Sequence, residues 1–148
     1  MNNLQGRIVV GVDGSDASID ALRWALRQAE LTSCELEAVT SWQQPSGYGT
    51  SFVAADEDWE ALVATILDDA LAKVDTRGVE IKRTTAHGHP AQILTDASMN
   101  ADLLVVGSRG HGGFVGMMLG SVSVHVCAHP HCPVLVIRHR DTGQSTSQ

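Results

Sequence analysis

The sequence predicts an α/β fold: an open, parallel sheet of five strands in the order 3-2-1-4-5, with helices on both faces. Three observations lead to this prediction. Short β-branched runs alternate with longer segments whose apolar residues recur at helical spacing. Several of the short runs are apolar throughout, as in strands buried on both faces of a parallel sheet. Glycine-containing turns follow the first and fourth runs, and if both turns contact one ligand, those two strands are neighbours.

The first strand and helix set a pattern that the rest of the chain repeats. Residues 7–12 form a β-branched run that ends in the turn 13–15, and apolar side chains then recur at helical spacing from Ile19 to Ala29. Ser15 is placed to cap the start of this helix. The later elements are expected in this chain order: strand 35–42, helix 57–76, strand 79–86, helix 91–99, strand 102–106, helix 121–128 and strand 133–138.

Glycine, proline and polar residues mark the boundaries of these later elements. Residues 43–51 are rich in Gly, Ser and Gln and predict an exposed loop after the second strand. Gly78 is expected to end the second helix, and Pro90 suits the first turn of the third. The polar tail 141–148 is expected to be disordered. Strands that alternate with helices need crossover connections, which makes the sheet parallel and the fold Rossmann-like.

The composition indicates a single globular domain over residues 1–148, ordered from about residue 5 to about residue 140. With 43% hydrophobic and 18% charged residues, one buried core is expected. No apolar run approaches the roughly 20 residues of a membrane-spanning helix, and the polar N-terminus lacks the regions of a secretion signal. We therefore expect a cytoplasmic protein without membrane contact. Its three cysteines are an odd set that fits reduced thiols.

The charge balance argues against nucleic acid as a partner. Ten Lys and Arg stand against 17 Asp and Glu, a formal net charge of −7, so the overall field repels phosphate backbones and anionic lipid. A phosphate group bound by this chain would have to be attracted locally, by backbone N–H groups or by the end of a helix. Loops at the ends of strands are therefore the expected place for such a site.

The segment 107–123, GSRGHGGFVGMMLGSVS, has the composition of a phosphate-binding loop that joins a buried strand to a helix. Glycines let the backbone approach a ligand closely, and successive N–H groups can converge on an anion. The helix start adds donors and the positive end of its dipole, and Ser108, Ser121 and Ser123 can add hydroxyl donors. The alternative, a surface loop whose glycines serve only turns, stays open, although such sheets bind phosphates at this kind of position.

This loop matches neither a Walker A motif nor a dinucleotide-binding fingerprint. Its spacing resembles the signature of the ATP-binding subgroup of universal stress proteins, Gly-x-x-Gly, nine residues and Gly-Ser. The residues that meet the signature are Gly107, Gly110, Gly120 and Ser121. The similarity spans about residues 7–138. Further matching segments are VVGVDGS at 9–15, GHPAQIL at 88–94, ADLLVVGSRGHGG at 101–113 and CPVLVIR at 132–138.

The resemblance implies a role for individual positions of this chain. Gly11, Asp13 and Val39 would lie near the adenine and ribose of ATP, and Mg²⁺ would accompany the nucleotide. The residues expected around the phosphates are Gly107, Ser108, Arg109, Gly110, His111, Gly112, Gly113, Gly120, Ser121, Val122 and Ser123. Asp13 can equally be a turn residue whose carboxylate accepts from nearby N–H groups, and both roles stay open.

The chain departs from many relatives after the signature, at Val124, where Glu is common, and at Pro130-His131, where Ala-Pro is commoner. These positions bear on the helix end and on partner contacts more than on ATP binding.

The same region holds a cluster of potential zinc ligands: His125, Cys127, His129, His131 and Cys132. Its spacing fits no regular zinc motif, so we expect no metal site; histidines near a helix C-terminus complement the dipole instead.

We expect a nucleotide-dependent stress regulator rather than a fast enzyme, and assign no catalytic residue. Rapid phosphoryl transfer needs cations on the transferred group, and Arg109 is the only Lys or Arg between Thr84 and Ile137. ATP would then be a retained ligand that shifts a conformational equilibrium. The alternatives are a slow ATPase or phosphotransferase that uses Arg109 and His111, with Asp13 holding Mg²⁺, and an interaction module that binds no nucleotide.

The last strand predicts an assembly. It is strongly apolar, and at an edge of the sheet it would need cover. Pairing of two such edges gives a symmetric homodimer through Pro133–Arg138, and the family resemblance implies the same. The sequence does not specify the signalling partner downstream.

Overall fold

A computed structural model describes residues 6–43, 56–110 and 119–139 of the chain. Within these residues the sheet has five strands in the order β3-β2-β1-β4-β5, parallel at every pairing. The strands are β1 (Arg7–Gly11), β2 (Glu35–Trp42), β3 (Ile81–His87), β4 (Leu103–Gly107) and β5 (Val134–Ile137). The helices are α1 (Asp16–Thr32), α2 (Asp56–Ala72), α3 (Pro90–Ala97) and α4 (Ser121–Ala128), with a short 3-10 turn, η1 (Ser98–Asn100), after α3. The predicted strand order is confirmed.

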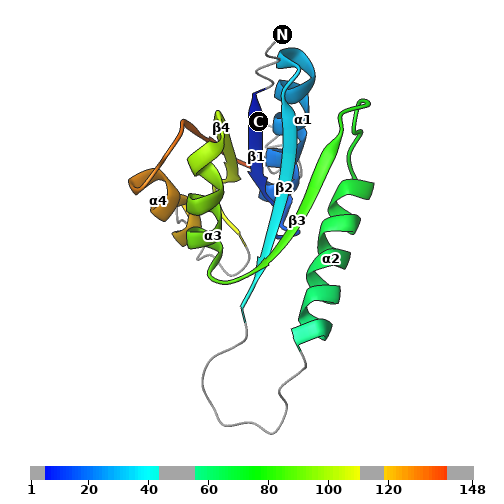
Figure 1. Ribbon diagram of the computed structural model, residues 1–148, viewed down its shortest axis with the longest axis vertical. Helices are drawn as coiled ribbons and strands as arrows, with labels where there is room; N and C mark the ends of the chain where they lie inside the picture. The colour runs from blue at the N-terminus through cyan, green and yellow to red at the C-terminus, as the bar shows by residue number, and fades with distance from the viewer. Residues whose placement is uncertain (1–5, 44–55, 111–118, 140–148) are drawn as a thin grey trace, which may run out of the picture.

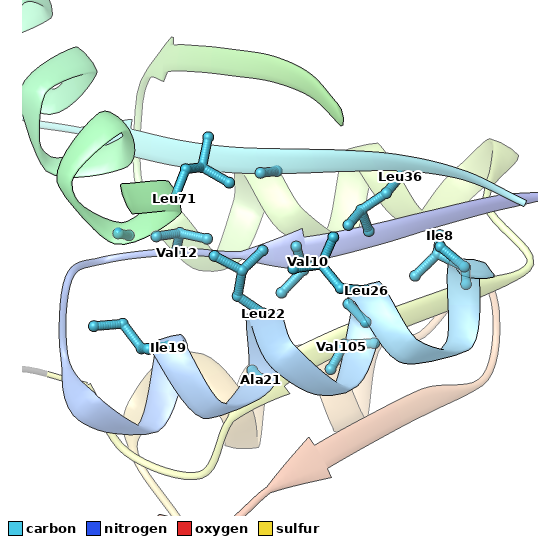
Figure 2. Packing of buried hydrophobic residues seen from close by; sticks show 14 of the residues in the cluster. Ile8, Val10, Val12, Ile19, Ala21, Leu22, Leu26, Leu36, Leu71 and Val105 are labelled. Carbon is cyan, nitrogen blue, oxygen red and sulfur yellow. The ribbon is translucent and has the colours of Figure 1, made fainter. Parts of the chain in front are cut away.

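Helices cover both faces of the sheet, as the sequence predicts. The helices α1 and α2 pack on one face, and α3 and α4 lie side by side on the other (Figure 1). Side chains along β1, β4 and β5 alternate between two cores: in β1, Ile8 and Val10 join the α1/α2 core, whereas Val9 joins the α3/α4 core. Figure 2 shows Leu22 and Leu26 of α1 packed against the Ile8 and Val10 side. The apolar strands are therefore buried on both faces.

The end of α2 differs from the prediction. We expected a helix to residue 76 closed by Gly78, but α2 ends at Ala72. Lys73 N–H bonds to the Ala70 carbonyl, three residues back, so the helix tightens and stops there. Arg77 and Gly78 have positive φ angles, 53° and 72°, and form a separate turn before β3. Gly78 therefore serves that turn and does not end the helix.

The remaining boundaries differ from the predicted ones by at most two residues, and η1 takes up the end of the predicted helix 91–99. Pro90 occupies the first turn of α3 as predicted. Ser15 caps α1, with its hydroxyl oxygen accepting a 3.3 Å bond from Ser18 N–H. The tail 141–148 and the predicted loop beyond residue 43 lie outside the described residues. No helix in the described ranges is long and apolar enough to cross a bilayer.

A buried ion pair that the sequence did not reveal ties β1 to β2 under the end of α3. The Glu37 side chain is 7% exposed and accepts from Arg7 Nη2, from Arg7 Nε at 3.0 Å and from Thr84 Oγ1 at 2.9 Å. Arg7 Nη1 also donates to the Ala97 carbonyl at 3.2 Å. Burial raises the pKa of Glu37, but the hydrogen bonds from Arg7 and Thr84 and the charges of Arg7 and Lys82 outweigh it, so the net pKa is lowered.

Candidate functional site

A cleft of about 1030 Å³ lies at the carboxyl ends of β1, β2 and β4. Its walls come from the turn after β1, the end of β2, the first half of α3, the loop after β4 and α4. The strands β1 and β4 are neighbours, yet the helices that follow them, α1 and α4, pack on opposite faces of the sheet. Open parallel sheets bind ligands where neighbouring strands diverge in this way.

Most of the predicted site residues line this cleft. They are Gly11, Asp13, Val39, Gly107, Arg109, Gly110, Gly120, Ser121, Val122 and Ser123. Ser108 does not line it: the side chain is 3% exposed, at the base of the loop after β4. His111, Gly112 and Gly113 lie outside the described residues. The structure thus brings the two predicted segments together, and their contact with a ligand stays a prediction.

The turn after β1 is held by the carboxylate of Asp13. Its Oδ1 accepts from Ser15 N–H at 2.8 Å and from Ser15 Oγ at 2.5 Å, and its own N–H donates to Ser18 Oγ at 3.3 Å. Asp13 therefore has the turn role that the sequence left open. A Cβ on Gly110 would clash with the other carboxylate oxygen, so the turn and the loop after β4 meet at this point.

The glycines of the signature each mark a close approach of backbone. A Cβ on Gly107 would lie 2.8 Å from the Ala17 carbonyl carbon of α1, and one on Gly120 would lie 3.3 Å from Arg109 Cα. Gly120 N–H donates to the Ser108 carbonyl at 2.6 Å, and Ser108 N–H donates to the Ile137 carbonyl at 2.7 Å. These contacts bring the two ends of the loop together and anchor them to β5. Gly107 and Gly120 of the signature therefore also serve the packing of the fold at the two ends of the loop.

The start of α4 presents backbone donors to the cleft. Gly120 is the N-cap and has no side chain to cap the first turn, and the first helical bond runs from Val124 N–H to the Gly120 carbonyl at 3.0 Å. The N–H groups of residues 121–123 precede that bond and, with the helix dipole, favour an anion. Ser123 Oγ donates to the Gly107 carbonyl at 2.5 Å, so donation to a phosphate, as predicted, would require this bond to open.

An apolar wall also lines the cleft, and the sequence predicted only part of it. Val39, Leu94 and Val106 line the cleft and are buried. A Cβ on Gly11 would lie 2.8 Å from Leu94 Cδ1, so glycine at this position lets α3 pack directly over β1. Pro90 and Leu94 belong to the segment GHPAQIL, which carried the resemblance without being given a site role. The wall offers a surface for a flat, largely apolar ring.

Three histidines line the end of the cleft between α3 and α4: His89, His125 and His129. His89 Nδ1 accepts a 3.2 Å bond from Ala91 N–H and so caps α3, which places the proton of the neutral ring on Nε2. The rings of His125 and His129 are tilted against each other with centroids 4.9 Å apart. Among the described residues, no group of three or more His, Cys, Asp or Glu is arranged to hold a metal ion.

The cysteines of the potential zinc cluster lie outside the cleft lining, and all three cysteines of the chain are free thiols. Cys127 is exposed on α4, and Cys132 is partly buried before β5. Burial raises the pKa of the Cys132 thiol, and the negative charge of Asp102 raises it further. The Cys132 thiol is therefore protonated at neutral pH and a weak nucleophile.

Comparison with known proteins identifies a family for this chain. The model described as "Universal stress protein family" matches residues 6–138. The chain is 35% identical over 148 aligned residues to universal stress protein Rv2623 of Mycobacterium tuberculosis, covering 91% of this chain and 48% of that protein. The chain thus spans about half the length of the mycobacterial relatives that it matches.

Two solved structures with similar folds carry nucleotides by their descriptions. A universal stress protein in complex with cAMP superposes with a TM-score of 0.70 and 27% identity, covering 92% of this chain and 98% of that one. A universal stress protein from Archaeoglobus fulgidus in complex with dAMP superposes with a TM-score of 0.65 and 26% identity, covering 90% of this chain and 98% of the other. Both ligands are adenine nucleotides.

Proposed function

The chain belongs to the universal stress protein family, and we propose that it binds an adenine nucleotide, ATP in the first place, in the cleft between the β1 turn and the start of α4. The observation that carries the proposal is the convergence of the glycine-rich loop and an uncapped helix start on one cleft of about 1030 Å³. Similar structures hold cAMP and dAMP, which supports the adenine class. The signature spacing supports placement in the ATP-binding subgroup.

We propose that the nucleotide lies across the cleft from the apolar wall to α4. The adenine and ribose would contact the wall at Val39 and the β1 turn at Gly11 and Asp13, where apolar surface and backbone polar groups meet. The phosphates would accept from the backbone of the loop after β4 and from the start of α4. Arg109 is the one Lys or Arg among the described residues that line the cleft, and it would add positive charge at the loop.

The donors in the cleft fit a magnesium ion that is bound mainly through phosphate. Mg²⁺ is commonly held by one or two carboxylates together with phosphates and water. Asp13 supplies the one carboxylate among the described lining residues, and its Oδ1 is already bonded to Ser15. Mg²⁺ would therefore enter with the nucleotide, with Asp13 as the one protein carboxylate near it, and would neutralise phosphate charge.

We propose a regulatory role with slow turnover at most. Fast phosphoryl transfer requires cations on the transferred group and a residue that orients the nucleophile. Among the described residues that line the cleft, Arg109 is the one Lys or Arg that could place a positive charge on the transferred group. Bound ATP would then favour one conformation or partner over another. Sustained phosphate release at several per second by the purified protein would favour the alternative, an ATPase or phosphotransferase.

The test is to identify the ligand and then to block its site. Mass spectrometry of the denatured, purified protein should find an adenine nucleotide, and calorimetric titration should rank ATP, ADP, AMP and cAMP. In the variant Gly120→Val the Kd for ATP should rise by about tenfold or more, since the branched side chain would crowd Arg109 Cα, 3.3 Å from a Cβ. The backbone at Gly120 (φ −74°, ψ 166°) accepts valine, so the fold should persist.

The matched control is Gly78→Ala, which places a strained residue at positive φ far from the cleft, with no atom within 4 Å of the new Cβ. It should cost stability of about 1 kcal/mol and leave the Kd for ATP unchanged. Equal ATP affinity in the wild type and in a folded Gly120→Val variant would reject the proposed site.

We also propose that β5 joins two copies of the chain as a homodimer through Pro133–Arg138. The strand β5 is an edge of the sheet, and Val134, Leu135 and Val136 are only partly buried. A monodisperse monomer at micromolar concentration in light scattering would reject this assembly.

A further inference from the structure

We infer that His125 of α4 and His129, the residue that closes this helix, form a proton-dependent anion subsite, which extends the proposed phosphate-binding side of the cleft and makes nucleotide affinity rise as the pH falls. This inference rests on the proposed nucleotide function of the same cleft. It assigns to the two histidines a direct contact with the terminal phosphate group of the bound nucleotide.

The position of the two rings carries the inference. Both histidines line the same cleft as Gly120 and Ser121. His125 follows Ser121 by four residues, so it lies one helical turn, about 6 Å, further along the same face of α4. His129 is the exposed C-cap of α4, four residues beyond His125, and the two ring centroids are 4.9 Å apart. A phosphate chain that starts at the N-terminus of α4 and runs along the helix would reach His125 first and His129 beyond it.

The charges around the cleft make the protonation of these rings decisive. Asp13 and Arg109 are the other charged side chains among the described lining residues, and their charges cancel. From α3, which packs against α4, the titratable groups are His89, engaged through Nδ1 with Ala91 N–H, and Asp96, which accepts from Gln92 at 2.9 Å. From the segment before β5 comes the Cys132 thiol, whose raised pKa keeps it neutral.

With neutral histidines, this side of the cleft therefore has almost no net positive charge, in a chain of formal net charge −7. Imidazole is the side chain that ordinarily changes charge within the physiological pH range. Each proton taken up by His125 or His129 adds a positive charge and a second N–H donor on the wall that faces the phosphates. By linkage, a bound phosphate favours the protonated rings to the same extent that protonation favours the phosphate.

The chemical consequence is a ligand preference that changes with pH. ATP, with a long anionic chain, would gain affinity on acidification, whereas adenosine, which has no phosphate, would not. A regulator built this way would retain its nucleotide more tightly in an acidified cell, without any change in nucleotide concentration.

The experiment compares Kd values from calorimetric titration at about pH 6 and about pH 8, at constant ionic strength. The proteins are the wild type, the double variant H125Q/H129Q and the control H131Q, whose histidine is exposed and outside the cleft lining. ATP itself takes up a proton in this range, but it does so equally with every variant. The ratio of Kd at high pH to Kd at low pH should be larger for the wild type than for H125Q/H129Q by on the order of tenfold, and H131Q should match the wild type.

Each outcome separates the two proposals. No binding of ATP to the wild type at either pH rejects the nucleotide function, and the subsite with it. ATP binding with the same pH ratio in wild type and H125Q/H129Q rejects the subsite alone. Adenosine should show no difference between the proteins, and a pH-dependent difference with adenosine would mean that the histidines act on the fold and not on phosphate. Circular dichroism at both pH values checks that the double variant is folded.

Discussion

The buried pair between Arg7 and Glu37 should be a main determinant of stability on the α3 side of the sheet. Replacing Arg7 with Met keeps the aliphatic stem but leaves the Glu37 carboxylate, 7% exposed, with only the 2.9 Å bond from Thr84. Removing one partner of a buried pair costs about 3–5 kcal/mol. Since the Arg7 side chain is 27% exposed, water can replace part of its interaction, and we expect about 3 kcal/mol.

The assay is urea denaturation at about pH 7 and about pH 5. In the wild type the pKa of Glu37 is lowered from its ordinary value of 4.5, so the ionised carboxylate favours the folded state. This contribution to the free energy of unfolding is fully present at pH values above 4.5 and is lost as the pH falls through the lowered pKa. In Arg7→Met the Glu37 carboxylate stays buried without the arginine, which raises its pKa. On acidification Glu37 takes up a proton, and the variant regains part of the lost free energy of unfolding. The difference in unfolding free energy between wild type and variant should therefore shrink on acidification.

Two further variants control this prediction. Arg83→Met breaks an ion pair with Asp68 in which both side chains are 58% exposed, and it should cost less than about 1 kcal/mol. Combining Arg7→Met with Glu37→Gln removes the unpaired charge and should cost less than Arg7→Met alone. A cost for Arg7→Met equal to that of Arg83→Met, or one independent of pH, would refute the reasoning.

Three other predictions follow from single contacts. Ser15→Ala should lower the free energy of unfolding by about 1 kcal/mol in urea denaturation, because it removes the cap of α1; an unchanged midpoint would contradict it. Gly107→Ala should lower the free energy of unfolding by about 1–3 kcal/mol, because the new Cβ would lie 2.8 Å from the Ala17 carbonyl carbon. A crystal structure of this variant in which α1 has not moved would contradict the contact. A thiol reagent at neutral pH should label exposed Cys127 well before Cys132, whose pKa is raised by burial, and peptide mapping would reveal the opposite order.

The glycine-rich loop shows which features of the candidate site the local sequence can predict and which it cannot. The spacing of Gly107, Gly110 and Gly120 predicted a loop between a buried strand and a helix, and the structure explains each glycine by a close backbone or side-chain contact. The hydroxyl of Ser123 was assigned to a phosphate, yet it donates to the Gly107 carbonyl within the fold. A hydrogen-bonding residue type is visible in a sequence, but the group it bonds to depends on what the fold places beside it.

The alternation of β-branched and helical segments was enough to predict the strands, the helices and the parallel sheet, and the strand order followed from the further hypothesis that two glycine turns share one ligand. Local periodicity and turn chemistry determine where strands, helices and turns form, since these elements depend on residues within a few positions of one another. Tertiary structure alone brought Leu94 and the three histidines to the cleft and paired Arg7 with Glu37, 30 residues apart. Such contacts join residues far apart in the chain and depend on how helices pack across neighbouring strands, which no local pattern encodes.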